Sequence, residues 1–335
     1  MATRSMVTVA TVVVLVGVGV STPAWAQGSN TWAPPRLADG QPDIQGMWNN
    51  VTALDIPLEL PDGFSGPDFT LEDLAAITAA RVAEAARRAA QPRAPSVGAY
   101  GAYWFDSYWN EAEENPAPAL IVEPLNGQIP DYTAAAQAVI DENMARLHDS
   151  YEFMESADRC ITRGVLSIMM PGVYNNGARI LQVPGFVIIQ SEMIHRARII
   201  PVDGRAHVSD KIRQWEGDPR GRWEGNTLVV ESTNFRHVRS MRAQTAGSRS
   251  RQSERQRLIE RFTIVGSDML QYSIQVDDPD TYTGTWSASF PMERNSEYEI
   301  YEYACHEGNY AIPNILAGAR MEEARAAQAA AEGPR

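Results

Sequence analysis

Ionisable and aromatic side chains are dense between residues 192 and 235, in segments whose other positions alternate as half-buried β-strands do. A charge inside a sheet needs a partner, water or a ligand, so this density is typical of a lined site. Paired arginines could hold an anionic group, while the neighbouring aromatic side chains line the same cavity. The candidate substrate-binding residues are Glu192, His195, Arg196, Arg198, His207, Trp215 and Trp223.

A short repeat lies within this region. The tripeptide Trp215-Glu216-Gly217 recurs as Trp223-Glu224-Gly225. The residues between the two copies, 218–222, combine Asp, Pro and Gly, which is a composition typical of turns. We therefore expect a turn at 218–222 that joins two strands.

Further ionisable groups fall on the faces of two later strands that period-two alternation predicts. Glu260 shares a face with Leu258 and Phe262, and Glu302 shares a face with His306. If both faces point into a barrel, the side chains of Glu260, Glu302 and His306 should lie within about 10 Å of one another. They would form either an internal salt-bridge network or a polar ligand cavity with perturbed pKa values.

The cavity interpretation would suit general acid/base catalysis. His306 could carry the proton, and Glu302 or Glu260 could orient it or replace it. Arg196 or Arg198 could stabilise developing negative charge. The sequence has no phosphate-binding loop, zinc spacing or Gly-x-Ser-x-Gly elbow, so we expect no cofactor and no metal. Residues 277–280 are more typical of a solvated turn than of a calcium loop.

The first residues have the pattern of an export signal. Arg4 precedes an apolar run from Val7 to Val20, which is too short for a comfortable membrane span, and residues 24–26 form a cleavage site. We expect cleavage after Ala26 and a periplasmic or secreted location. The formal net charge of −13 argues against nucleic acid or an anionic membrane as a partner.

The chain has two cysteines, Cys160 and Cys305. An exported protein meets an oxidising compartment, so we expect a disulfide that ties the middle of the chain to its end. The alternative is that Cys305, beside His306 and Glu307, is a nucleophile.

Composition changes near residue 150. Residues 27–150 form an arm with two predicted helices, 71–90 and 134–148. Thr70 and Asp73 open the first as an incomplete capping box, and Thr133 can cap the second. After residue 175 the apolar pattern has period two, and strands are predicted at 178–183, 186–190, 192–202, 227–233, 258–265, 269–276, 285–290 and 297–306.

These elements predict an α+β protein. About eight sequential strands with short links favour an antiparallel β-barrel of the calycin or lipocalin-like kind over residues 151–316. The N-terminal arm and both helices would pack on it, and a β-sandwich is the alternative. Residues 317–335 are rich in Ala and Glu and are predicted to form a helix with a frayed tail.

Four stretches resemble a family of exported bacterial proteins: residues 35–48 (PRLADGQPDIQGMW), 223–230 (WEGNTLVV), 277–279 (DDP) and 301–310 (YEYACHEGNY). The resemblance covers nearly the whole chain after the export signal. It implies an exported protein with a lipocalin-like barrel, but it supplies no activity and no catalytic residues. Asn226 stands where many relatives are expected to have Asp, which argues against a catalytic acid at this position.

The sequence as a whole favours an exported enzyme that performs acid/base chemistry on a small, partly apolar organic molecule in a barrel cavity. A lyase, an isomerase or a hydrolase would fit. The first alternative is a periplasmic small-molecule binding protein in which Arg196 and Arg198 hold an anionic ligand. The second is a structural or assembly protein that docks through its Pro-rich arm.

Overall fold

The structure is a computed structural model that describes residues 32–61, 63–64, 69–90, 117–242 and 249–332. The expected export signal therefore lies outside the described residues. The described residues from Pro34 onward belong to one compact unit. No helix within the described residues has the length and apolar character needed to cross a membrane.

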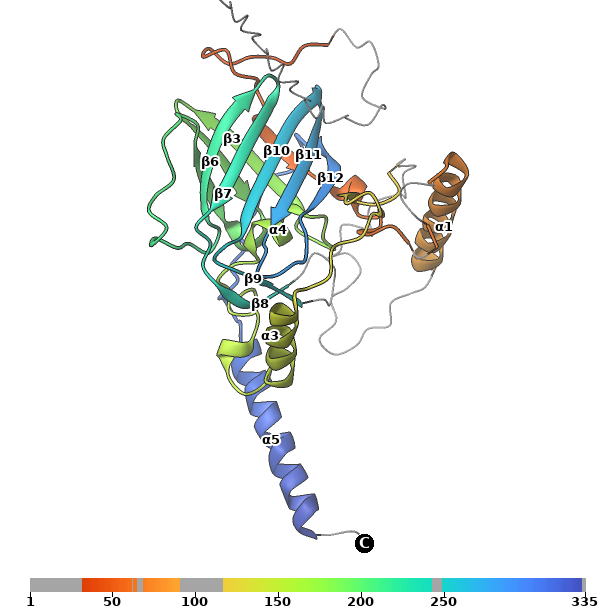
Figure 1. The fold of residues 1–335 in the computed structure, drawn as a ribbon, viewed down its shortest axis with the longest axis vertical. Helices are drawn as coiled ribbons and strands as arrows, with labels where there is room; N and C mark the ends of the chain where they lie inside the picture. Colours follow the sequence, from red (N-terminus) through yellow and green to blue (C-terminus); the bar gives the residue numbers. More distant parts are fainter. Residues whose placement is uncertain (1–31, 62, 65–68, 91–116, 243–248, 333–335) are drawn as a thin grey trace, which may run out of the picture. The chain divides into compact units, whose positions relative to one another are not determined.

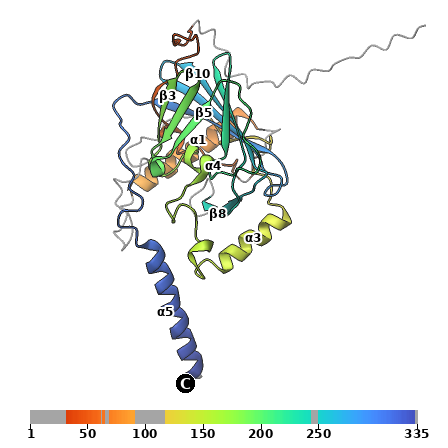
Figure 2. The ribbon, with the colours of Figure 1, turned by 90° about the vertical axis from the view of Figure 1, so that its left-hand side faces the viewer.

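A single antiparallel sheet curls into a nearly closed barrel (Figures 1 and 2). Its nine strands follow the order β5-β4-β3-β1-β12-β11-β10-β7-β6, and β2 pairs with β12 beside this path. The strands are β1 (Gly46–Asn49), β2 (Ile121–Glu123), β3 (Gly177–Val183), β4 (Phe186–Ser191), β5 (Ala197–Pro201), β6 (Asp218–Glu224), β7 (Thr227–Thr233), β10 (Arg257–Gly266), β11 (Met269–Asp277) and β12 (Trp286–Arg294). The expected α+β fold with an antiparallel barrel is confirmed.

The two ends of this strand order meet at Gly221 of β6. A Cβ atom added there would lie 2.9 Å from Cγ2 of Ile200, which is in β5, and 2.7 Å from Cγ1 of Val202, which follows β5. Glycine is therefore the residue that lets β6 approach β5 closely. This contact nearly closes the barrel.

The barrel interior is filled by side chains from alternating positions. The ring centroid of Tyr272 on β11 lies 5.0 Å from that of Phe262 on β10 and 5.1 Å from that of Phe290 on β12. All three rings are essentially inaccessible to solvent. Aromatic packing at these distances stabilises a core beyond the effect of area alone.

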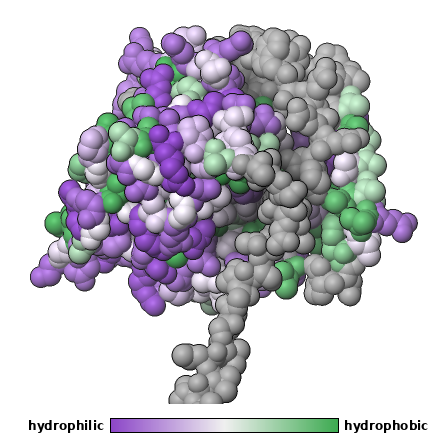
Figure 3. All heavy atoms as spheres, turned by 90° about the horizontal axis from the view of Figure 1, so that it is seen from above, coloured by the Kyte–Doolittle hydropathy of each residue, from purple (hydrophilic) through white to green (hydrophobic). Residues whose placement is uncertain are grey.

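The remaining elements lie outside the barrel, and α5 (Ala311–Glu332) projects away from it (Figures 1 and 2). The strands β8 (Val238–Arg242) and β9 (Arg249–Gln252) pair with each other in antiparallel fashion and contact α3. The described face in Figure 3 is mostly hydrophilic, with apolar residues in small groups. The helices are α1 (Leu71–Ala90), α3 (Ala134–Ala145), α4 (Gly164–Met169) and α5 (Ala311–Glu332), with short 3₁₀ turns η2 (Val51–Ala53), η5 (Tyr151–Phe153) and η6 (Met193–His195).

Both expected helix starts are confirmed. Asp73 accepts a hydrogen bond from the Thr70 backbone N–H (2.8 Å), and Thr70 Oγ1 accepts one from the Asp73 N–H (3.1 Å). The shorter Asp side chain thus completes the reciprocal capping box that usually contains Glu. Thr133 Oγ1 accepts from the Ala136 N–H at 3.1 Å and caps α3, which ends at Ala145, three residues before the expected end.

Two predictions of local structure are wrong. Residues 218–222 belong to strand β6 and do not form a turn, because Pro219 lies at the end of the strand order, where its missing N–H removes little pairing. Residues 297–306 do not form a strand. The preceding strand β12 already pairs with β1 on one side and β11 on the other, so it offers no free edge for the segment that follows.

The expected strand 192–202 is shorter than predicted. The turn η6 replaces its first part, and Ile194 there has a φ of +58°. The turn interrupts the alternation of side chains before β5 begins. Arg198 therefore has a buried side chain, whereas that of Arg196 is partly exposed.

Candidate functional site

Arg198 and Glu260 form a bidentate ion pair inside the barrel. Arg198 Nη1 lies 2.5 Å from Glu260 Oε2 and Nη2 lies 2.8 Å from Oε1, while the Tyr272 hydroxyl donates to Oε1 at 3.0 Å. Burial raises the pKa of the Tyr272 phenol well above its usual value, so Tyr272 remains a donor. For Arg198, burial opposes the charge, but attraction to Glu260 outweighs it and the pKa lies above its ordinary value.

This arrangement matches the internal salt-bridge interpretation. The side chains of Arg198 and Glu260 are 5% and 0% exposed, and each satisfies the other. A pair of this kind binds no outside ligand without first being broken, which is costly in a buried site.

The expected cluster of Glu260, Glu302 and His306 does not form in the barrel interior. Glu302 and His306 lie after β12 in a segment without regular structure, and both are exposed. Glu260 is fully buried. The prediction that the three share an inward face is wrong, because it rested on a strand at 297–306 that has no pairing edge.

Arg196 pairs with a residue that the sequence did not single out. Its Nε lies 3.0 Å from Glu216 Oε1, which also accepts a hydrogen bond from Thr162 Oγ1 at 2.8 Å. The Arg196 side chain is 41% exposed and that of Glu216 is 10% exposed, so the pair is partly open to solvent. Glu216 belongs to the first copy of the Trp-Glu-Gly repeat.

His207 contacts β6 at a separate place. Its Nδ1 lies 3.0 Å from Asp218 Oδ2, and Arg220 Nη1 donates to Asp218 Oδ1 at 2.7 Å. The Val208 N–H also donates to Asp218. These contacts hold His207 and Val208 against the start of β6.

The other candidates do not gather in one place either. The guanidinium carbon of Arg236 lies 5.0 Å from the ring centroid of Trp215. Trp223 is half-buried in β6. His195 lies in η6, and its side chain is outside the described part of the structure.

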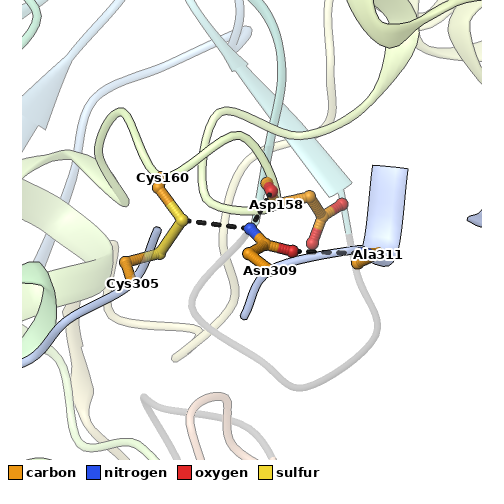
Figure 4. The surroundings of a disulfide bond; sticks show 5 residues. All are labelled: Asp158, Cys160, Cys305, Asn309 and Ala311. Carbon is orange, nitrogen blue, oxygen red and sulfur yellow. Dashed lines mark hydrogen bonds between the residues drawn. A yellow bond between two sulfur atoms is a disulfide. The ribbon is translucent and has the colours of Figure 1, made fainter. Parts of the chain in front are cut away.

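The expected disulfide is confirmed, with the Cα atoms of Cys160 and Cys305 5.6 Å apart. Figure 4 shows the side chain of Asn309 between this bond and the start of α5. Asn309 Nδ2 donates to the Asp158 carbonyl at 3.2 Å, and Asn309 Oδ1 accepts from the Ala311 N–H at 3.1 Å. We call residues 295–310 the strap, because this disulfide ties them to the loop around Cys160.

Glu192 holds the other end of the strap. This buried carboxylate accepts hydrogen bonds from Asn175 Nδ2 (2.9 Å), the Gly177 N–H (3.2 Å) and the Tyr298 hydroxyl. A Cβ atom at Gly177 would lie 2.8 Å from Glu192 Oε2, so only glycine leaves room for this contact. Glu192 thus anchors the strap through Tyr298.

A cleft of about 1030 Å³ lies between the strap, the loop around Cys160 and the turns beside β3 and β5. Its walls combine phenol rings and carboxylates with one guanidinium, Arg163, which donates to the Tyr174 hydroxyl at 3.2 Å. Its size is that of a site for a small organic molecule. The tyrosines are Tyr174, Tyr298, Tyr301, Tyr303 and Tyr310, and the acids are Asp158, Glu192, Glu302 and Glu307.

A smaller cavity of about 330 Å³ lies against α1 and is mostly apolar. Its cation, Arg81, donates to the Asp55 carbonyl at 2.6 Å, and burial lowers the pKa of Arg81. This contact anchors α1 to the chain before it. The strap cleft, with more polar groups and three times the volume, is the stronger candidate site.

Three of the cleft residues, Glu192, Glu302 and Cys305, were predicted site residues, but the tyrosines were not. The signal was present in residues 301–310, which contain three Tyr and two Glu but only one aliphatic residue, Ala304. Such a segment has no dry face and is more typical of a surface than of a barrel strand.

No protein-family model, curated protein or solved structure matches this chain. Within the described residues, no group of three or more His, Cys, Asp or Glu side chains is placed to hold a metal ion.

Proposed function

We propose that this protein is an exported small-molecule binding protein and that its ligand occupies the strap cleft. The observation that carries the proposal is the cleft itself, about 1030 Å³ in volume, with exposed aromatic rings and ionisable groups on its walls. Such clefts combine an apolar or aromatic surface for the body of a ligand with a few polar groups that orient it.

The distribution of the barrel's charges also favours binding at the strap. Arg198 and Glu260 neutralise each other in the interior, and the neighbouring volume is filled by Phe262 and Tyr272. A ligand in the barrel would have to displace these groups, whereas the strap cleft already has the needed volume.

Export is supported by two features of the chain. The first residues have the pattern of an export signal, and Cys160 bonds with Cys305. Disulfides persist in oxidising compartments such as the periplasm and the extracellular space. The resemblance of residues 223–230 and 301–310 to exported bacterial proteins points the same way.

A second candidate is an acid/base enzyme that uses the same cleft. The observation in its favour is the contact between Tyr298 and Glu192, which places a phenol proton against a carboxylate at the wall of the cleft. Such a pair can exchange a proton with a bound molecule when the strap shifts. Lyase, isomerase or hydrolase chemistry would then follow.

Thermal-shift screening of a small-molecule library against the mature protein tests binding. We expect hits whose stabilisation is lost in Tyr301→Ala and Tyr310→Ala but is retained in Tyr151→Ala, a matched change at an exposed tyrosine outside the cleft. Hits that survive both cleft changes would place the ligand elsewhere and contradict the proposal.

The enzyme candidate is tested with the same hits. Each hit is incubated with the protein and analysed by mass spectrometry. Conversion by the wild type that falls by about 10²-fold or more in Tyr298→Phe, while affinity is kept, favours the enzyme. Unchanged hits favour the binding protein.

A further inference from the structure

The walls of the strap cleft carry an excess of negative charge. Four carboxylates line it, those of Asp158, Glu192, Glu302 and Glu307, against the guanidinium of Arg163. The described donors to Glu192, which are Asn175, the Gly177 N–H and Tyr298, are neutral, so they do not cancel its charge. Among the described residues, no cation forms an ion pair with Asp158, Glu302 or Glu307.

Two positive contributions oppose this charge, and both are smaller. Arg163 already donates to the Tyr174 hydroxyl, with its guanidinium carbon 5.7 Å from the ring centroid. The N-terminus of α5 reaches the cleft at Ala311, where a helix carries roughly half a positive charge and Asn309 already accepts from the N–H. The formal net charge of the side chains that line the cleft is therefore negative.

The exposed rings add a second kind of recognition that is independent of the carboxylates. Tyr301 and Tyr310 line the cleft and are 74% and 70% exposed. Exposed aromatic side chains that line one cleft offer a ligand an aromatic surface, and the face of a phenol ring attracts cations. The Arg163 and Tyr174 pair on the same wall is an internal example of this contact.

We propose that the cleft takes an organic cation, in which an ammonium or guanidinium group is attached to an aromatic or apolar body. The charged group would lie against the Tyr301 and Tyr310 rings with Glu302 and Glu307 beside it. The body would occupy the rest of the cleft along Ile194 and Ala304. This inference rests on the proposed function, since it names the ligand class for the same site.

Three probes with the same aromatic body and different charge test it: benzyltrimethylammonium, benzyl alcohol and benzoate. Titration calorimetry on the mature, disulfide-bonded protein should give the cation about tenfold tighter binding than the neutral probe, with benzoate the weakest. High salt should weaken binding of the cation and leave that of benzyl alcohol unchanged.

Substitutions in the cleft test whether the tighter binding of the cation occurs there. Glu302→Gln with Glu307→Gln should weaken the cation about threefold to tenfold without changing benzyl alcohol, while Glu322→Gln on the exposed part of α5 should change neither. Tyr301→Phe should keep the affinity that Tyr301→Ala loses. Circular dichroism checks that each variant is folded.

Failure of this inference is separable from failure of the proposed function. Benzoate or benzyl alcohol binding as tightly as the cation, with sensitivity to Tyr301→Ala, overturns the ligand class but keeps the cleft as a site. If the cation binds with the same affinity in the Glu302, Glu307 and Tyr301 variants as in the wild type, both the ligand class and the cleft as its site are overturned. Absence of cation binding at millimolar concentration overturns the ligand class, and the library screen then decides the function.

Discussion

At the scale of single residues, the predicted site charges fall into two environments, the barrel interior and the strap cleft. Arg198 and Glu260 are among the most buried ionisable groups of the described residues, and they neutralise each other. Glu302 and Glu307 remain in contact with solvent at the cleft. The first group stabilises the fold, and the second is open to a ligand.

The buried pair yields the first prediction. Glu260→Gln should lower the free energy of unfolding by about 3–5 kcal/mol, because it leaves Arg198 buried without a counter-charge. Arg198→Met combined with Glu260→Leu should cost clearly less than the single change, since neither charge remains. Urea denaturation measures both, with Arg261→Gln on the exposed face of β10 as control. A Glu260→Gln protein as stable as the wild type would contradict the prediction.

A surface pair gives a pH-dependent prediction. The hydrogen bond from Arg257 to Glu231 (2.8 Å) lowers the pKa of Glu231 below its usual 4.5. A carboxyl group whose pKa is lowered by folding stabilises the protein above the unfolded pKa, and this contribution is lost as the pH falls through the folded pKa. Glu231→Gln should therefore cost less than about 1 kcal/mol at neutral pH and nothing in strong acid.

Urea denaturation at several pH values measures this difference. Glu322→Gln, on an exposed helix, should show no such pH dependence. A difference between Glu231→Gln and wild type that grows in acid would show that the sign is wrong.

At the scale of elements, the strap is the part most dependent on a few contacts. It has no regular structure, and it is held by the disulfide at one end and by Tyr298 and Glu192 at the other. The disulfide joins residues 145 positions apart in the sequence, so it restricts the unfolded chain strongly. Its removal should therefore affect both the strap and the whole protein.

Cys160→Ser with Cys305→Ser should lower the free energy of unfolding by about 2–4 kcal/mol. Chymotrypsin should then cut the strap at Tyr301 or Tyr310 sooner than in the wild type, while far-UV circular dichroism of the barrel stays unchanged. Equal cleavage rates with and without the disulfide would mean that other contacts hold the strap.

The elements also separate what the sequence predicted from what it missed. Strands β4, β7, β10 and β11 have six to ten residues of clear alternation, and their predicted bounds agree closely with the structure. β1 and β2 have four and three residues, which is too short for alternation to stand out. The start of α1 was predictable because Thr70 and Asp73 act locally.

The site was harder to predict because it is assembled from distant segments. Glu192 meets Tyr298 across 106 positions, and Asn309 meets Asp158 across 151. No spacing in the sequence encodes such contacts. The assignment of 297–306 to a strand also placed Glu302 and His306 in the barrel, and it failed because pairing edges depend on the whole strand order.

At the scale of the whole molecule, the closure of the barrel depends on one close approach. Gly221→Ala should push β6 away from β5, because the new Cβ atom would meet the stiff, branched side chains of Val202 and Ile200 below 3 Å. We expect a loss of about 1–3 kcal/mol in the free energy of unfolding, measured by urea denaturation. Gly266→Ala in β10, where the nearest atom would be 3.7 Å away, is the matched control and should have little effect. Adding Val202→Ala to Gly221→Ala should recover part of the loss if crowding causes it. A Gly221→Ala protein that unfolds like the wild type would mean that the two strands can separate without cost, and that the sheet need not close for the protein to be stable.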